Sequence, residues 1–166
     1  SYKDKIDIIC IRPATVCGLS ERLRLDLTVN KLTFDAFYKK KIFVDGGSQI
    51  RPNIHIKDLI SAIDCLTFTK KKLRHNIFNA GFENLTISEI ANKIKKRTGA
   101  KIKINKNKDI RSYRQDSSRL LKFGFKPNYN VNLAINELIH FFNSKSKFNF
   151  TKKNFNLQRM KELNIK

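Results

Sequence analysis

The sequence places one arginine where a phosphate ligand could sit. Arg51 stands in "SQIRPNIHIKDL", at the start of an alternating apolar stretch, and Pro52 restrains the backbone from which its side chain projects. A guanidinium can donate two parallel hydrogen bonds to phosphate oxygens, a geometry that lysine cannot reproduce. Arg51 is therefore our first candidate for a phosphate contact. The alternative is a surface arginine paired with Asp45 or Asp58.

Other reactive side chains lack partners in the sequence. Cys10, Cys17 and Cys65 sit in or beside apolar runs with no CxxC pair and no clustered histidine, so we expect buried free thiols and neither a zinc site nor a disulfide framework. His55 and His140 have no nearby acid or nucleophile in the sequence. We therefore predict no metal site and no catalytic residue.

The net charge of +21, from 35 Lys and Arg against 14 Asp and Glu, leaves two interpretations open. One is a basic module that binds nucleic acid. The other is a solvated surface with a compositional bias, since the excess is mostly lysine and accompanies many Asn and Ile. The basic runs are spread along the chain and are not interleaved with the aromatic residues that single-strand binding uses. This spread favours the solvated surface.

The 166 residues can bury one core. No run approaches the roughly 18 to 20 apolar residues that cross a bilayer, and the start "SYKDKIDIICIRP" has no signal-peptide pattern. We expect a cytoplasmic protein without a membrane partner. Residues 1–143 are predicted to form the folded part, and residues 144–166 a basic tail with little regular structure.

Apolar periodicity and turn residues predict alternating strands and helices. Asp58 is expected to cap the helix that it begins, and "TISE" at 86–89 is a capping-box pattern. The predicted strands are 6–11, 42–47, 52–56, 76–81 and 101–105, and the predicted helices are 24–38, 58 onward, 86–97, 118–123 and 131–142. This alternation indicates an α/β fold.

Six segments in order resemble the carboxyl-terminal half of the NAD-dependent epimerase/dehydratase family, the extended short-chain dehydrogenases that act on nucleotide-activated sugars. The segments are "RPATVCG", "RLRLDLTVNKL", "GGSQIRPNIHIKDLISAI", "NIFNAG", "LTISEIA" and "DIRSYRQDSSRLLKFGFKP", between about residues 5 and 142. The resemblance implies late strands of a Rossmann-like parallel sheet and a small α/β substrate-binding lobe.

The resemblance also implies roles for particular residues. Arg51 and Asn30 would contact the diphosphate or the sugar of a nucleotide-diphosphate sugar, and Arg111 would supply a second cation, with Lys106 or Arg114 as substitutes. Thr15 would lie near the substrate, and Pro13 and Ala14 beside the nicotinamide of NAD. Family members often have tyrosine where Cys17 stands, so we assign Cys17 no role beyond packing.

Two of the family's functional motifs are absent from the sequence. It has no Gly-rich turn of the kind that holds a dinucleotide, and no tyrosine stands four residues before a lysine. The resemblance places both motifs ahead of the strand at 6–11. We therefore expect a substrate-binding half that is inactive alone, completed by a separate amino-terminal half, or a non-catalytic remnant. Nothing in the sequence separates epimerisation from dehydration.

Overall fold

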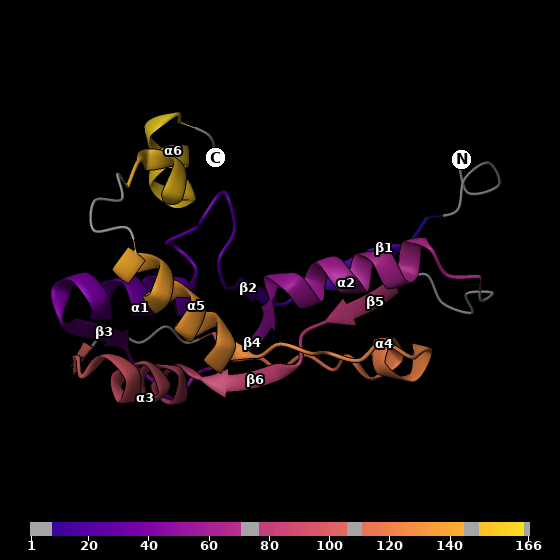
Figure 1. Cartoon of the computed structure of the whole chain (residues 1–166), viewed down its shortest axis with the longest axis horizontal. Helices are drawn as coiled ribbons and strands as arrows, with labels where there is room; N and C mark the ends of the chain where they lie inside the picture. The colour runs from indigo at the N-terminus through magenta and orange to yellow at the C-terminus, as the bar shows by residue number, and fades with distance from the viewer. Residues whose placement is uncertain (1–7, 71–76, 106–110, 145–149, 165–166) are drawn as a thin grey trace.

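The structure is a computed structural model, and it describes residues 8–70, 77–105, 111–144 and 150–164. Helices and parallel strands alternate, which confirms the predicted α/β class. The chain forms an elongated molecule with a narrow arm at one end and a helix-rich body at the other (Figure 1). A short three-stranded sheet joins the two parts.

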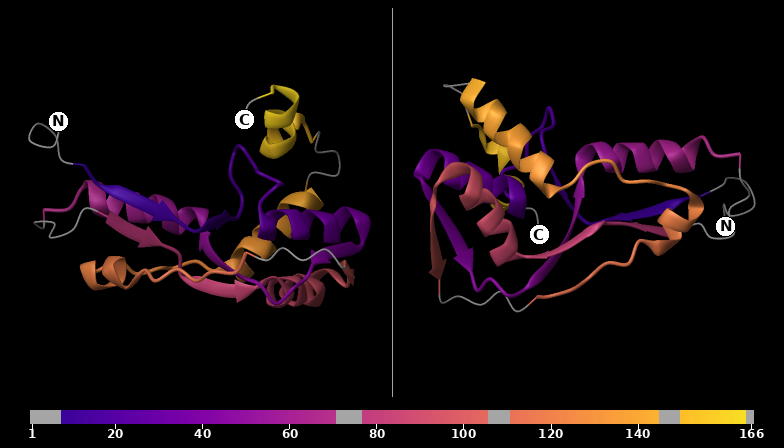
Figure 2. Two further views of the ribbon diagram at one scale, coloured as in Figure 1. Left: turned by 180° about the vertical axis from the view of Figure 1, so that it is seen from behind. Right: turned by 60° about the horizontal axis from the view of Figure 1, so that its bottom comes forward.

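The arm is built on two parallel strands, β1 (Cys10–Pro13) and β5 (Ile77–Ala80). Helices α2 (Ile56–Thr67) and α4 (Ser118–Phe123) lie on opposite sides of this strand pair (Figure 2). Ala62 and Leu66 of α2 pack in one cluster with Phe78 of β5 and Leu120 of α4. Burial of these side chains stabilises the arm.

The body pairs β3 (Lys41–Asp45) in parallel with β7 (Lys101–Asn105). Its helices are α1 (Thr28–Lys39), α3 (Ile87–Thr98) and α5 (Val131–Ser144). All three present an apolar face to one cluster with the buried residues of β3. The fully buried members are Val29, Ala36, Ile42, Ile90, Ala91, Ile94, Ala134 and Ile135.

The joining sheet has the order β2 (Thr15–Cys17), β4 (Ile50–His55), β6 (Glu83–Thr86). Strand β2 runs parallel to β4, and β6 runs antiparallel to it. Strands β1 and β2 are separated only by Ala14, so the chain changes its pairing partner there, from β5 to β4. The two sheets part at this residue.

Several predicted details are confirmed. Thr86 and Glu89 form the capping box of α3, and the hydrogen bonds from Thr86 lower the pKa of Glu89. The helix then ends at Gly99 in a left-handed conformation, as predicted. The helix at 118–123 is followed by Gly124 with positive φ. Lys101 and Lys103 of β7 are exposed, as an edge strand requires.

Other boundaries differ from the predictions. The first described strand begins at Cys10 rather than 6, and residues 6 and 7 lie outside the described ranges. The first helix begins at Thr28 rather than 24, because Leu23 and Leu25 are buried on an irregular loop. Strand β6 was not predicted. Cys10 is exposed on β1, whereas Cys17 is buried and Cys65 is half-buried; all three are free thiols.

Asp58 does not cap α2. That helix begins at Ile56, and the N-cap is His55, whose side chain accepts from the backbone N–H of Lys57. The Asp58 carboxylate, 1% exposed, accepts instead from the backbone N–H groups of Asn128 and Tyr129, at 2.9 and 3.0 Å. It ties α2 to the segment that leads into α5.

The tail contains more structure than predicted. Residues Lys152–Asn154 form a 3-10 turn, η1, and Asn156–Glu162 form helix α6. Phe150 and Phe155 pack against the buried Leu23, Leu25, Leu138 and Phe142. The apolar side chains that appear scattered in a lysine-rich sequence are therefore the contacts that attach this segment to the body.

Candidate functional site

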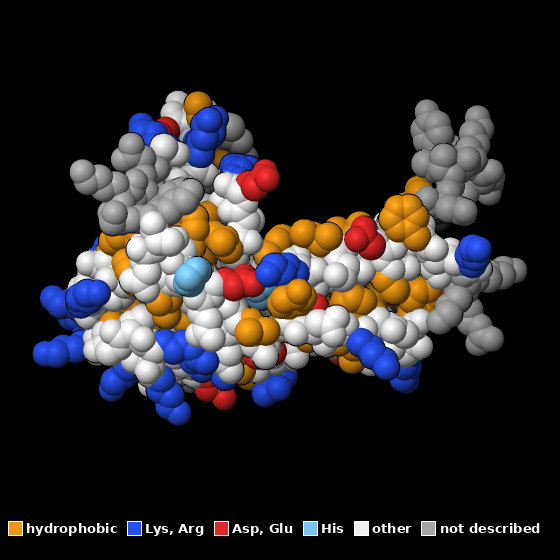
Figure 3. Space-filling view, in the orientation of Figure 1, with side chains coloured by type: hydrophobic (Ala, Val, Ile, Leu, Met, Phe, Trp, Pro, Cys, Tyr) orange, Lys and Arg blue, Asp and Glu red, His pale blue; other side chains and the backbone are white. Residues whose placement is uncertain are grey.

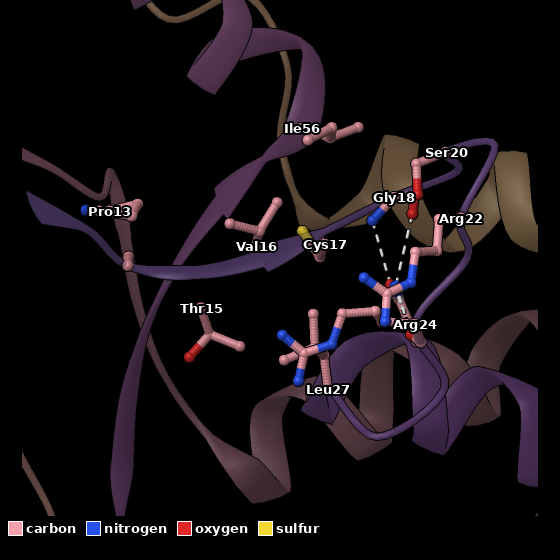
Figure 4. Close-up of a pocket in the computed structure, with 12 residues that line it drawn as sticks. Pro13, Thr15, Val16, Cys17, Gly18, Ser20, Arg22, Arg24, Leu27 and Ile56 are labelled. Atoms are coloured by element: carbon pink, nitrogen blue, oxygen red, sulfur yellow. Dashed lines mark hydrogen bonds between the residues drawn. The ribbon is translucent and has the colours of Figure 1, made fainter. Parts of the chain in front are cut away.

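The larger of two adjoining cavities, about 470 Å³, lies beside Ala14, where the chain passes from the β1–β5 pair to the β2–β4 pair (Figure 4). Crevices outside the carboxyl ends of parallel strands are common ligand sites in α/β folds. Its lining comes from the β1–β2 segment, the loop that follows, and the first residues of α1 and α2. These residues are Pro13, Ala14, Thr15, Val16, Cys17, Gly18, Ser20, Arg22, Arg24, Leu27, Asn30 and Ile56.

The back of this crevice depends on a close backbone approach. The Ala14 N–H donates to the carbonyl of Ala80 at 2.8 Å, which brings Ala14 against Gly81. A Cβ on Gly81 would lie 2.5 Å from the Ala14 Cβ and 2.3 Å from Gln115 Oε1. Glycine is therefore required at position 81 if Ala14 is to line the cavity.

Two arginines extend into this cavity from residues 18–27, which we call the pocket loop (Figure 4). Arg24 is held by Asp26 through two hydrogen bonds of 3.0 Å. Arg22 donates to the side-chain oxygen of Asn156 at 2.8 Å. Neither arginine was predicted from the sequence as a site residue. The alternation in "RLRL" was the available signal, since it places the leucines on one side and the arginines on the other.

Asn30 lies on α1 at the edge of the same cavity, but its amide is engaged with the pocket loop. Its Oδ1 accepts from the N–H of Gly18 at 3.1 Å, and its Nδ2 donates to the carbonyls of Gly18 and Arg24 at 3.4 and 3.0 Å. Both amide hydrogens thus have protein acceptors. Asn30 thus ties the first residue of the loop, Gly18, to Arg24.

Arg51 is buried, with 8% of its surface exposed, and lines neither of the two adjoining cavities. Its Nη1 donates to the carbonyl of Ile50 and to that of Arg111, and its guanidinium lies 5.4 Å from the ring centroid of Tyr113. Arg51 therefore contacts the segment that contains Arg111. It does so through the Arg111 backbone, while the Arg111 side chain is exposed.

The second cavity, about 390 Å³, shares Pro13, Ala14 and Thr15 with the first. Its opposite wall is Pro52 with Tyr113, Arg114 and Gln115. That wall is held to the sheets by reciprocal bonds between Asn84 and Gln115 and between Gly81 and Ser117. Arg114, the predicted substitute for Arg111, is thus the cation that lines this cavity. Lys106, the other predicted substitute, lies outside the described residues.

Buried titratable groups lie behind the first cavity. His55 is 2% exposed, stacks on Tyr129 with ring centroids 4.9 Å apart, and contacts Glu137 through Nε2 at 3.2 Å. Because Nδ1 accepts from the Lys57 N–H, Nε2 carries the hydrogen and donates to Glu137. Burial lowers the pKa of His55, partly offset by Glu137. Burial, reinforced by nearby carboxylates, raises the pKa of Cys17 to about 12, so its thiol stays protonated.

This arrangement predicts a pH dependence of stability. Because the folded pKa of His55 lies below its ordinary value of 6.5, the unfolded chain binds more protons as the pH falls below that value. The stabilisation is complete above pH 6.5 and is lost as the pH falls through the folded pKa. Urea unfolding at pH 7.5 and 5.5 should show a lower midpoint at pH 5.5. The loss should persist in His140→Gln and shrink in His55→Gln; an unchanged loss in His55→Gln would contradict the assignment.

The described residues hold no group of three or more His, Cys, Asp or Glu side chains that could bind a metal ion. None of the helices in the described ranges has the length and hydrophobicity needed to cross a membrane. On the face in Figure 3, Lys and Arg side chains are spread over the body, the arm and the carboxyl-terminal segment and form no single patch.

Similar solved structures are enzymes of nucleotide sugars. The UDP-glucuronic acid 4-epimerase of Bacillus cereus, solved with UDP-glucuronic acid and NAD, has a TM-score of 0.72 at 21% identity, over 86% of this chain and 48% of that one. The dTDP-glucose 4,6-dehydratase of Bacillus anthracis, solved with NAD, has a TM-score of 0.71 at 20% identity, over 86% of this chain and 47% of that one. TunA, an NAD-dependent NDP-hexosamine 5,6-dehydratase of tunicamycin biosynthesis, has a TM-score of 0.69 at 17% identity, over 81% of this chain and 45% of that one.

No family model matches the chain. The chain spans slightly less than half the length of each of these three proteins. The match covers 81 to 86% of this chain with TM-scores of 0.69 to 0.72. The chain therefore has the α/β, Rossmann-like fold that is found in about half of each of these three proteins.

Proposed function

We propose that this chain is the substrate-binding half of an NAD-dependent enzyme that epimerises or dehydrates a nucleotide-diphosphate sugar. The observation that carries this proposal is a cavity with two arginines at the point where β1 and β2 change sheets. Three proteins of similar fold are enzymes of this class. A diphosphate needs cations beside a cavity large enough for a sugar, and this crevice supplies both.

The cavity linings assign the roles within this proposal. Arg22 and Arg24 would hold acidic groups of the substrate in the first cavity, and Arg114 would do so in the second. Thr15, which lines both, would lie beside the sugar. Arg51 would act by fixing the backbone of Arg111, and Asn30 by fixing the pocket loop. Remote binding energy of this kind can position a reacting carbon.

NAD would take a hydride from a sugar carbon in the reaction that this class performs. Pro13 and Ala14 present small apolar side chains to both cavities, a surface that suits the face of a nicotinamide ring. No Gly-rich dinucleotide turn and no Tyr-x-x-x-Lys is present in the 166 residues. We therefore propose that the chain needs an amino-terminal half for turnover and is inactive by itself.

The arm offers a surface for such a half. Among the described residues β1 pairs with β5 alone, so one edge of β1 is open, and Cys10 and Ile8 beside it are exposed. Hydrophobic side chains also gather along α2 (Figure 3), where Ile60 and Ile63 are 52% and 44% exposed. A parallel sheet is normally covered on both faces and extended at such an edge.

Replacing Arg24 with glutamine should weaken binding of UDP by about tenfold to a hundredfold, because a charge-assisted contact to phosphate would be lost. Titration calorimetry of the 166-residue chain with UDP, dTDP and ADP measures this effect. The matched control is Arg119→Gln, which removes the same charge from the exposed face of α4. Equal affinities for the wild type and Arg24→Gln, with the fold intact, would contradict the assignment of Arg24.

A further inference from the structure

The carboxyl-terminal segment, residues 150–164, is bonded to the pocket loop. Asn154 is 8% exposed and contacts the loop through two groups. Its Nδ2 donates to the carbonyl of Leu23 at 2.7 Å, and its backbone carbonyl accepts from the N–H of Leu25 at 2.8 Å. Its Oδ1 meanwhile accepts from the N–H of Thr151 at 3.0 Å, which closes its own turn.

The same segment covers the apolar side of the loop. Leu23 and Leu25 are 1% and 0% exposed, in a cluster that Phe150 and Phe155 complete. The Phe150 ring lies 4.6 Å from that of Phe34 on α1, edge to face. The segment is thereby anchored both to the loop and to a helix of the body.

Burial of the two leucines orients the two arginines. The side chains of these four residues alternate between the two sides of the loop. With Leu23 and Leu25 turned toward the tail and the core, Arg22 and Arg24 are turned toward the cavity, which both of them line. Residues 18–27 form neither helix nor strand, so ordering them is opposed by conformational entropy that neighbouring contacts must offset.

We propose that the carboxyl-terminal segment positions the pocket loop, with Asn154 as the positioning residue, and so sets the orientation of Arg22 and Arg24 for substrate. Asn30 holds the loop from the α1 side, and Asn154 holds it from the tail side. The side-chain oxygen of Asn156 adds a direct contact to Arg22. The effect on ligand binding rests on the proposed function, whereas the effect on the loop does not.

Hydrogen–deuterium exchange of the full 166-residue chain without ligand tests the loop directly. In Asn154→Ala, the amide of Leu25 and the peptide over residues 18–27 should exchange about tenfold faster than in the wild type, as loss of one buried hydrogen bond allows. The amides of α3 should be unchanged. Asn154→Asp keeps the acceptor for the Thr151 N–H but puts a carboxylate oxygen in place of the donor to the Leu23 carbonyl, so it should show at least the same increase. Lys153→Ala, an exposed neighbour on the same turn, is the control.

Calorimetry with UDP on the same variants tests the consequence. We expect the Kd for UDP to rise about tenfold in Asn154→Asp and to stay unchanged in Lys153→Ala. Unchanged exchange at Leu25 in Asn154→Asp would overturn the positioning role. The positioning role would also be overturned if Asn154→Asp exchanged faster but bound UDP with an unaltered Kd, while Arg24→Gln bound UDP poorly. If the wild type binds no nucleotide and the exchange still rises, the loop contact stands and the proposed function fails.

Discussion

Replacing Asp58 with alanine is expected to lower the free energy of unfolding by about 3 kcal/mol, because two backbone N–H groups lose a charged acceptor in a buried position. The carboxylate is 1% exposed, and each of its oxygens accepts one of the N–H groups of Asn128 and Tyr129. Water can replace only part of this bonding. Urea unfolding followed by circular dichroism measures the change, with the slope against urea unaltered if unfolding remains two-state.

The loss should extend beyond Asp58 itself. Tyr129 stacks on His55, and Lys57 lies 5.1 Å from the centre of the Tyr129 ring while bonding Glu137 at 2.6 Å. Releasing the Tyr129 backbone should expose His55 and weaken its bond to Glu137.

Asp64→Ala is the matched control for this prediction. Asp64 lies on the same helix with an exposed side chain, and its removal should change stability by less than about 0.5 kcal/mol. Similar losses in Asp58→Ala and Asp64→Ala would mean that the two N–H groups find other partners. The link between α2 and α5 would then not depend on Asp58.

Local rules predicted the elements whose ends are set by their own residues. The capping box of Thr86 and Glu89, the glycine caps at 99 and 124, and the alternating strand at 101–105 follow from near neighbours in the sequence. The prediction that Asp58 caps α2 failed because its carboxylate oxygens accept from the N–H groups of Asn128 and Tyr129, 70 and 71 residues away. A helix-start pattern gives no information on such partners.

The residues around the cavities also divide into those that could be selected from the sequence and those whose position depends on distant contacts. The resemblance placed Pro13, Ala14 and Thr15 at the ligand, and these residues line both cavities. It selected Arg51 by residue type and position, yet the side chain lies under the backbone of Arg111, a contact formed only when residues 60 apart meet. It did not select Arg22 and Arg24: the alternation in "RLRL" puts both on one side, but the tail that covers Leu23 and Leu25 carried no periodic signal to show which side faces the cavity.

Gly18→Ala is expected to destabilise the fold by about 3 to 4 kcal/mol, from backbone strain together with overpacking. Gly18 has a φ of +105°, which side-chain-bearing residues rarely adopt, and an added Cβ would lie 2.9 Å from Nε2 of His55. The imidazole cannot withdraw freely, since it is stacked on Tyr129 and bonded to Glu137. Urea unfolding measures the loss, and calorimetry should show weaker UDP binding because Gly18 also anchors Asn30.

Gly99→Ala separates the two contributions. Gly99 also has a positive φ, +69°, but nothing lies within 4 Å of an added Cβ, so only the backbone term of about 1 to 2 kcal/mol applies. Gly18→Ala should therefore cost clearly more than Gly99→Ala, and it alone should affect nucleotide binding, because it displaces the wall from which the pocket loop begins. Equal losses in the free energy of unfolding for Gly18→Ala and Gly99→Ala would show that the His55 ring moves aside. The packing behind the cavity would then be more easily displaced than its hydrogen bonds imply.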